Sequence, residues 1–270
     1  MKPVDFAYER PGTIADAVAL LSGHDNAKVM AGGQTLGPML NLRLAQPDLV
    51  VDIRRISELA RVEESADALV LGTCVTHAAI EDGRVPDPAR GMLASVAHRI
   101  AYRAVRTRGT IGGSLAHADP AADWVSCLTA LDATVLVSGP AGRRELSLAA
   151  FVRGVMETEL TTQEIVDGVR IAKLSASARW GYHKICRKTG EFAEAIGAVV
   201  IDRDVARIVA GATSGRPIVM QVPAKEIVDR RNTSADIAAR LEAAGLEADM
   251  YEMRIHAAAV RRAIEEAIAQ

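Results

Sequence analysis

Apolar and polar residues alternate with different periods along the chain, and the first fifty residues show two of these patterns. Residues 14–21 have the apolar spacing of an amphipathic helix, and Thr13 before them is suited to cap it. Short apolar runs at 27–30 and 49–53 predict buried strands, and 35–44 between them predicts a helix. This order predicts a compact βαβ-like unit with a loop at its strand-to-helix turn.

The middle of the chain mixes the two periods in a longer series. The predicted elements are strands over 68–73 and 133–137, and helices over 76–81 and 91–102. Asp119-Pro120 predicts the start of a further helix that runs to about Leu131, with Asp119 as its cap and Pro120 at its first position. We therefore expect a second unit that combines a sheet with several helices.

The residues from about Glu164 onward predict a smaller α+β block. Its predicted elements are strands over 164–171, 180–187, 192–200 and 206–210, a turn at 214–217, and two helices that follow Ser234 and are split near Gly245. In the second of these helices we expect His256 to lie on the surface, and we place His24 in a turn. Neither histidine has a base or nucleophile beside it in the sequence.

Two glycine pairs stand out in this pattern, in Ala31-Gly32-Gly33-Gln34-Thr35 and in Thr110-Ile111-Gly112-Gly113-Ser114. Each follows an apolar approach, carries a small polar residue and precedes a predicted helix. Glycine permits positive φ and close approach of the backbone, and successive N–H groups can then turn inward toward an anion. Either pair alone is more often a tight turn, but together they favour a ligand with two linked phosphates, a dinucleotide.

The spacing of the glycines excludes the two commonest nucleotide motifs. A dinucleotide fingerprint of the Rossmann type needs three glycines at fixed offsets, whereas Gly32-Gly33 is followed by Gly37 and Gly112-Gly113 has no third partner. The Gly-Lys-Ser or Gly-Lys-Thr of a P-loop is absent from the sequence.

Composition narrows the function further. Of the 270 residues 49% are hydrophobic and the net charge is −2, which gives no support to nucleic-acid binding. No stretch reaches the roughly eighteen apolar residues that span a bilayer, and residues 1–6 lack the apolar run of a signal peptide, so we expect a cytoplasmic protein. The cysteines, which form no zinc or iron–sulfur motif, are Cys74, Cys127 and Cys186.

Several polar residues allow more than one interpretation. His117, Asp119 and Asp123 suggest a metal site, but helix capping and binding of ligand hydroxyl groups explain their spacing better. The acidic run that includes Asp167 is typical of a solvated face. Lys184 and the two cations after it either form a polar strand face or place a cation beside a ligand, and the residues alone leave both open.

The two glycine motifs carry a family resemblance. Ala31 to Leu36, followed by Asn41 to Ala45 and Val51 to Ile53, resembles the FAD-binding subunit of molybdenum-containing hydroxylases of the xanthine dehydrogenase, carbon monoxide dehydrogenase and aldehyde oxidase type. Arg108 to Pro120 is similar to the second FAD loop of that family. Residues 151–164 and 182–193 also resemble its segments, although Glu191 stands where the family usually has Asp.

The resemblance implies an α+β chain with a vanillyl-alcohol-oxidase-like FAD-binding fold. Two α/β subdomains are expected over 1–56 and 57–172, followed by a C-terminal α+β domain over 173–270. The residues that it assigns to FAD are Met30, Ala31, Gly32, Gly33, Gln34, Thr35, Leu36, Thr110, Ile111, Gly112, Gly113, Ser114, His117, Asp119, Asp123, Val166, Tyr182 and Lys184. The two glycine segments should hold the diphosphate, Asp123 the ribityl chain, and Val166, Tyr182 and Lys184 the flavin.

The resemblance also implies a division of labour among subunits. FAD is expected to be held noncovalently and to pass electrons from [2Fe–2S] clusters on a small partner subunit to an external acceptor. Substrate hydroxylation is expected at a molybdopterin centre on a large partner subunit, in a dimer of heterotrimers. This chain then needs no catalytic residue of its own. The alternatives are a stand-alone FAD oxidase and a non-redox nucleotide-binding scaffold subunit.

Overall fold

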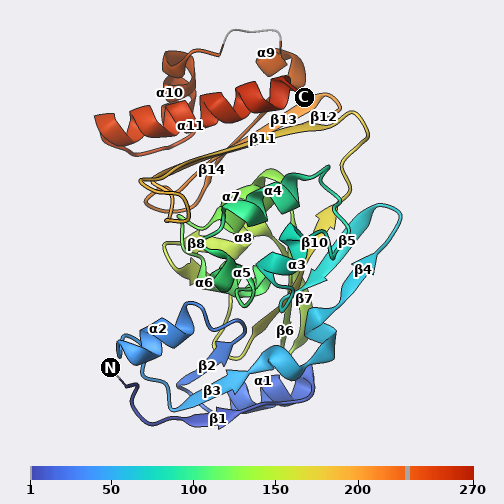
Figure 1. Ribbon diagram of the computed structural model, residues 1–270, viewed down its shortest axis with the longest axis vertical. Coiled ribbons are helices and arrows are strands. Elements are labelled where there is room, and N and C mark those ends of the chain that lie inside the picture. Colours follow the sequence, from blue (N-terminus) through green and yellow to red (C-terminus); the bar gives the residue numbers. More distant parts are fainter. Residues whose placement is uncertain (1, 229–231) are drawn as a thin grey trace.

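The computed structural model describes residues 2–228 and 232–270, and three larger sheets follow one another along it, with a two-stranded sheet of β8 and β9 beside them (Figure 1). The N-terminal sheet is parallel, with the order β1-β3-β2. Its strands are β1 (Ala7–Glu9), β2 (Ala27–Met30) and β3 (Leu49–Asp52). Helices α1 (Ile14–Ser22) and α2 (Leu36–Asn41) connect them, and Thr13 caps α1 as predicted. The predicted βαβ unit is therefore confirmed, although α2 is shorter than expected.

The central strand β3 explains why this unit is stable. All four of its residues are buried, and Leu49 and Val51 pack against Ala17 and Leu21 of α1. Because the strands are parallel, β2 and β3 end at the same edge of the sheet, and the first glycine pair follows β2 there. Open parallel sheets bind ligands at this edge.

The second sheet is antiparallel, with the order β4-β5-β10-β6-β7. Its strands are β4 (Val62–Glu64), β5 (Ala68–Gly72), β6 (Thr134–Gly139), β7 (Gly142–Ser147) and β10 (Ile165–Ala172). The helices of this region are α3 (His77–Glu81), α4 (Met92–Arg99), α5 (Arg103–Arg106), α6 (Ile111–His117), α7 (Asp123–Ala130) and α8 (Leu148–Phe151). Short elements complete it: η1 (Ile53–Arg55), η2 (Ser57–Ala60), β8 (Val152–Gly154) and β9 (Glu157–Thr158). Trp124 and Phe151 lie fully buried in the core between helices and sheet.

The third sheet is a four-stranded meander packed between helices. Its strands are β11 (Arg179–Ile185), β12 (Ala195–Asp202), β13 (Val205–Gly211) and β14 (Ile218–Pro223), followed by α9 (Ala224–Val228), α10 (Ser234–Ala243) and α11 (Met250–Ile268). A Cβ on Gly181 would lie 1.8 Å from the Ala263 carbonyl oxygen, so glycine lets α11 approach the sheet closely. Helix α7 packs on the opposite face of the sheet (Figure 1). Ser126 of this helix meets Gly211 there. The third sheet is thereby joined to the second unit.

Several sequence expectations are wrong in this fold. The run 164–171, expected in the C-terminal block, forms β10 in the middle of the second sheet. The second glycine pair lies within helix α6 and not in a loop. Asp119 does not cap the next helix, which begins only at Asp123 after Ala122; its carboxylate instead accepts from the Ala121 N–H at 2.9 Å. His256 is buried at 3% exposure and does not lie on the helix surface.

Among the described residues no helix has both the length and the apolar character to cross a membrane.

Candidate functional site

The two glycine segments, far apart in sequence, are in contact. A Cβ on Gly32 would lie 2.0 Å from the Arg108 carbonyl oxygen and 2.9 Å from the Gly109 Cα, and one on Gly113 would lie 3.8 Å from the Ala31 Cβ. Residue 32 therefore has to be glycine because two backbones meet there. The prediction that both motifs contribute to one place in the molecule agrees with this contact.

The first segment leaves its backbone donors open. Gly33 adopts a φ of +71°, the left-handed conformation that glycine favours. In the described part of the chain, the N–H groups of Gly33, Gln34, Thr35 and Leu36 donate to no protein acceptor, and the Thr35 side chain makes no capping bond to α2. Such a run of unused N–H groups is suited to an anion.

The second segment uses its donors internally. The N–H groups of Ile111 and Gly112 donate to the carbonyls of Val75 and Thr73, at 3.0 and 3.1 Å. The Gly113 N–H donates to the Thr110 hydroxyl at 3.1 Å, which caps α6. Inward-facing N–H groups, expected here from the sequence, are therefore absent over 111–113. The glycines serve packing instead, since a Cβ on Gly112 would lie 1.6 Å from the Thr73 hydroxyl oxygen.

His77 supports the second segment from behind. Its backbone N–H donates to the Gly109 carbonyl at 3.0 Å, and its ring Nδ1 accepts from Trp124 Nε1 at 2.9 Å. Burial lowers the pKa of His77 to about 4, and the nearby charge of Arg106 adds to this shift. The imidazole is therefore neutral near pH 7. Sequence reasoning missed it because its partner Trp124 lies 47 positions away.

A buried cluster joins the start of α7 to strand β11. The carboxylate of Asp123 accepts from the Tyr182 hydroxyl at 2.8 Å and from the Lys184 ammonium at 2.9 Å. The Asp123 and Lys184 side chains are each 6% exposed. Burial raises the pKa of Asp123, and the Lys184 charge opposes that shift. Lys184 is therefore paired inside the protein, and the simple interpretation of a polar strand face is wrong for it.

Tyr182 lies deeper than a side chain that meets a ligand would be expected to lie. It is fully buried, and the guanidinium carbon of Arg99 lies 5.7 Å from the centre of its ring. Its hydroxyl donates to Asp123, and burial raises its pKa well above the usual range. In this structure Tyr182 thus holds Asp123 in place.

The other predicted residues are not bonded to this cluster in the described structure. Val166 is buried on β10, directly before a bulge at Asp167. Asp167 does not lie on a solvated face, as predicted, but is 1% exposed and bonded to Arg61 and to Ser138. His117 and Asp119 lie half-buried at the end of α6. Within the described residues, no group of three or more His, Cys, Asp or Glu side chains is arranged to hold a metal ion.

A carboxylate that sequence reasoning overlooked lies beside the first glycine segment. Asp52 pairs with Met30 across the parallel sheet and is fully buried. It accepts from the Tyr8 hydroxyl and from Arg54, at 2.9 Å from Nε and 2.6 Å from Nη2. Burial alone raises its pKa, but the bonds from Arg54 and Tyr8 outweigh burial and lower it to about 2. The sequence signal that could have identified Asp52 was a single acidic residue within the apolar run 49–53.

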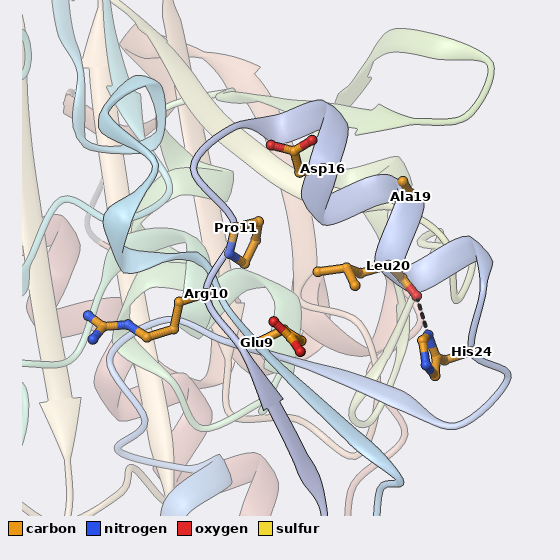
Figure 2. Close-up of a pocket in the computed structure, with 7 residues that line it drawn as sticks. All are labelled: Glu9, Arg10, Pro11, Asp16, Ala19, Leu20 and His24. Atoms are coloured by element: carbon orange, nitrogen blue, oxygen red, sulfur yellow. Dashed lines mark hydrogen bonds between the residues drawn. The ribbon is translucent and has the colours of Figure 1, made fainter.

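Two hollows on the surface of the described residues lie elsewhere. One of about 450 Å³ lies between β1 and α1, where Glu9 and Asp16 place two carboxylates and Arg10 extends away from α1 (Figure 2). The other, of about 580 Å³, lies between α1 and the β6–β7 hairpin. Neither lining includes a residue of the two glycine segments. Two carboxylates also make the first hollow a poor place for a diphosphate.

Comparison with known proteins identifies the family. Residues 4–173 match the family described as FAD binding domain in molybdopterin dehydrogenase. The nicotine 6-hydroxylase medium subunit of Paenarthrobacter nicotinovorans is 35% identical over 269 residues, 97% of this chain and 93% of that protein. The carbon monoxide dehydrogenase medium chain of Hydrogenophaga pseudoflava is 37% identical over 203 residues, 74% of this chain and 70% of that protein.

Solved structures agree over the full length. Quinoline 2-oxidoreductase from Pseudomonas putida 86 contains a chain that superposes with a TM-score of 0.86 at 30% identity, covering 100% of this chain and 99% of that one. The predicted α+β fold of the FAD-binding type is thereby confirmed, and FAD is confirmed as the cofactor of the family. The chain belongs to the FAD-binding, medium-subunit family of molybdenum-containing oxidoreductases.

Proposed function

We propose that this chain holds FAD noncovalently in a molybdenum-containing oxidoreductase. The bound flavin would relay electrons from [2Fe–2S] clusters on a small partner subunit to an external acceptor. Substrate hydroxylation would take place at a molybdopterin centre on a large partner subunit. We further propose a dimer of such heterotrimers in the cytoplasm. The supporting observations are membership of the family and the medium-subunit relatives.

The observation that carries this proposal is the contact of the two glycine segments at Gly32. Gly32 meets the backbone of Arg108 and Gly109, and the open N–H groups of Gly33 to Leu36 follow it directly in the chain. We propose that Met30–Leu36 donates to the diphosphate and that Thr110–Ser114 forms the wall against which it lies. Because the donors are fixed before the ligand arrives, binding would require little reordering of the loop.

The Asp123 cluster fits the sugar-like part of the cofactor. Each carboxylate oxygen of Asp123 accepts one bond and has lone pairs left for a ribityl hydroxyl. Lys184 would keep one positive charge near the flavin, and Tyr182 would orient Asp123 from the protein side. We also assign Val166, at the buried end of β10, to the apolar edge of the flavin. His117 and Asp119 would lie next to the ribityl chain.

We propose domain boundaries that follow the three sheets. The parallel sheet with η1 belongs to 1–56, the five-stranded antiparallel sheet to 57–172, and the four-stranded sheet with the C-terminal helices to 173–270. The glycine contact then lies between the first two units. The pair of Asp123 and Lys184 lies between the second and the third.

The visible spectrum and FAD binding test this function. The chain, purified alone and with its partner subunits, should show flavin absorption and release FAD on denaturation. Stripped protein should rebind FAD but not FMN, which lacks the second phosphate and the adenosine. A colourless preparation that no concentration of FAD reconstitutes would contradict the proposal. Steady oxidation of an organic substrate by the isolated chain would favour a stand-alone oxidase instead.

A further inference from the structure

Arg106 is a nearly buried cation outside the residues assigned to FAD. Its side chain is 10% exposed. It binds both carboxylate oxygens of Glu81, at 2.7 Å through Nε and 3.0 Å through Nη2. Its Nη1 donates to the carbonyls of Ile100 and Ala101, at 2.9 and 3.1 Å. One side chain thus ties helix α3 to the turn that precedes α5.

That turn is strained, and it contacts the loop that contains Gly190. Ala101 has a φ of +41°, a conformation that residues other than glycine adopt only at a cost. A Cβ on Gly190 would lie 3.0 Å from the Ala101 carbonyl oxygen and 3.2 Å from the Tyr102 ring. Gly190 belongs to the 186–194 connection that leaves β11 shortly after Lys184. The position of this connection therefore depends on the turn that Arg106 holds.

Arg106 also lies four positions before the second glycine segment. It is the last residue of α5, and the Gly109 N–H donates back to the Val105 carbonyl at 2.7 Å. Arg108 and Gly109, two and three positions after Arg106, supply the backbone that contacts Gly32. A shift of the end of α5 would move this backbone and open the contact between the two glycine segments.

We propose that Arg106 is a positioning residue for the FAD site, and this inference rests on the proposed function. Through one guanidinium it fixes the backbone against which the first glycine segment packs and the turn that supports the connection after Lys184. A lysine cannot replace it, because an ammonium lacks the planar fork that binds a carboxylate at two points while also reaching two carbonyls.

The test compares Arg106→Lys with Arg103→Lys in the holoenzyme. Arg103 binds the same Glu81, at 2.7 Å, and also Asp82, but it is 49% exposed and donates to no backbone carbonyl in the described structure. FAD is removed and rebound, and its Kd is measured together with the visible circular dichroism of the flavin at saturating FAD. Arg106→Lys should weaken FAD binding at least about tenfold and change the spectrum. Arg103→Lys should change the Kd for FAD by less than about twofold and leave the spectrum unchanged.

Equal Kd values and spectra for Arg106→Lys and the wild type would overturn the inference, and so would equal losses in the two variants. If Arg106→Lys does not fold, Glu81→Gln provides the second test, because it removes the charge that orients the guanidinium while keeping the side-chain shape. An unchanged Kd and spectrum in Glu81→Gln would also overturn the inference. Wild-type protein that fails to bind FAD contradicts the proposed function itself, so the two failures are distinguishable.

Discussion

The two glycine pairs look alike in the sequence but have different roles in the structure. Gly33 uses its positive φ to shape a loop whose N–H groups remain open. Gly112 and Gly113 lie in helix α6, where their N–H groups are already bonded and the missing side chains allow close packing on Thr73 and Thr110. The first segment therefore has free N–H donors for a ligand, whereas the second packs within the protein and forms the wall of the proposed site.

This difference predicts that the first segment matters mainly for ligand binding and the second mainly for the stability of the fold. The contacts of the second segment are contacts within the protein, so substitutions there should destabilise the chain before any ligand is considered. The first segment has few such contacts apart from Gly32, and substitutions there should act mainly on FAD. Four sets of variants test this separation, from the largest expected effect to the smallest.

Gly112→Val should have the largest effect. Its Cβ would lie 1.6 Å from the Thr73 hydroxyl oxygen and 2.7 Å from the Thr73 Cα, so α6 has to move away from 73–77. We expect the free energy of unfolding of the FAD-free protein to fall by about 3 kcal/mol or more. FAD retention should be lost as well. Urea unfolding and the flavin content after purification measure the two effects.

Two further glycines serve as comparisons for this variant. Gly32→Val should also abolish FAD retention, because its Cβ would lie 2.0 Å from the Arg108 carbonyl oxygen and would separate the two segments. Gly37→Ala is the control, since a Cβ there meets nothing within 4 Å. Full flavin content in both valine variants would refute the assignment of these segments to FAD.

His77 should give the second segment a pH dependence. Its pKa of about 4 in the folded protein lies below the value of 6.5 in the unfolded chain, so between these values the unfolded chain binds the extra proton. The free energy of unfolding is therefore unaffected by titration of His77 above pH 6.5, and it decreases as the pH falls from 6.5 toward 4. By linkage the loss amounts to roughly 3 kcal/mol.

His77→Asn should remove this part of the pH dependence, because asparagine keeps an acceptor for Trp124 Nε1 but does not titrate. The measurement is the free energy of unfolding of both proteins from pH 7 to pH 4, compared as a difference. Asp52 and Glu81, whose pKa values are about 2, contribute equally to the two proteins. Parallel curves would show that His77 does not titrate as its burial requires.

Much of the fold follows from local signals that the sequence carries. The hydroxyl of Thr13 caps α1, and the apolar run at 27–30 forms a strand with the predicted limits. The errors arise where distant residues decide the outcome. Glycines disfavour a helix, yet Gly112 lies in α6 because Thr73 and Val75 accept its N–H bond and that of its neighbour. Asp119 looks like a cap, but its carboxylate bonds within the turn before α7.

The site was predictable only as far as its residues lie in continuous motifs. The glycine segments and Asp123 could be named because they form runs with a recognisable order. Arg106 and His77 could not, since their partners Glu81 and Trp124 are 25 and 47 positions away. Tyr182 shows the same limit, because its burial depends on packing between α7 and β11 that no local pattern expresses.

Gly33→Ala should have a moderate effect that falls mainly on the ligand. A Cβ there meets only the flexible end of Met30, at 3.4 Å, so the cost comes from the φ of +71°. We expect a loss of between about 1 and 2 kcal/mol in the free energy of unfolding. FAD binding should weaken as well, because alanine disfavours the conformation that presents the open N–H groups. A variant with unchanged FAD affinity would show that the open donors are not the diphosphate contacts.

The smallest expected effect compares two threonines that precede helices. The Thr110 hydroxyl caps α6, so Thr110→Ala should lower the stability of the FAD-free protein by about 1 kcal/mol. The Thr35 hydroxyl makes no capping bond to α2, so Thr35→Ala should change that stability by less than about 0.5 kcal/mol while weakening FAD binding. Thermal unfolding of stripped protein and FAD titration separate the two quantities. Equal destabilisation by both variants would mean that the first segment stabilises the fold as much as the second, and the distinction between donor and wall would fail.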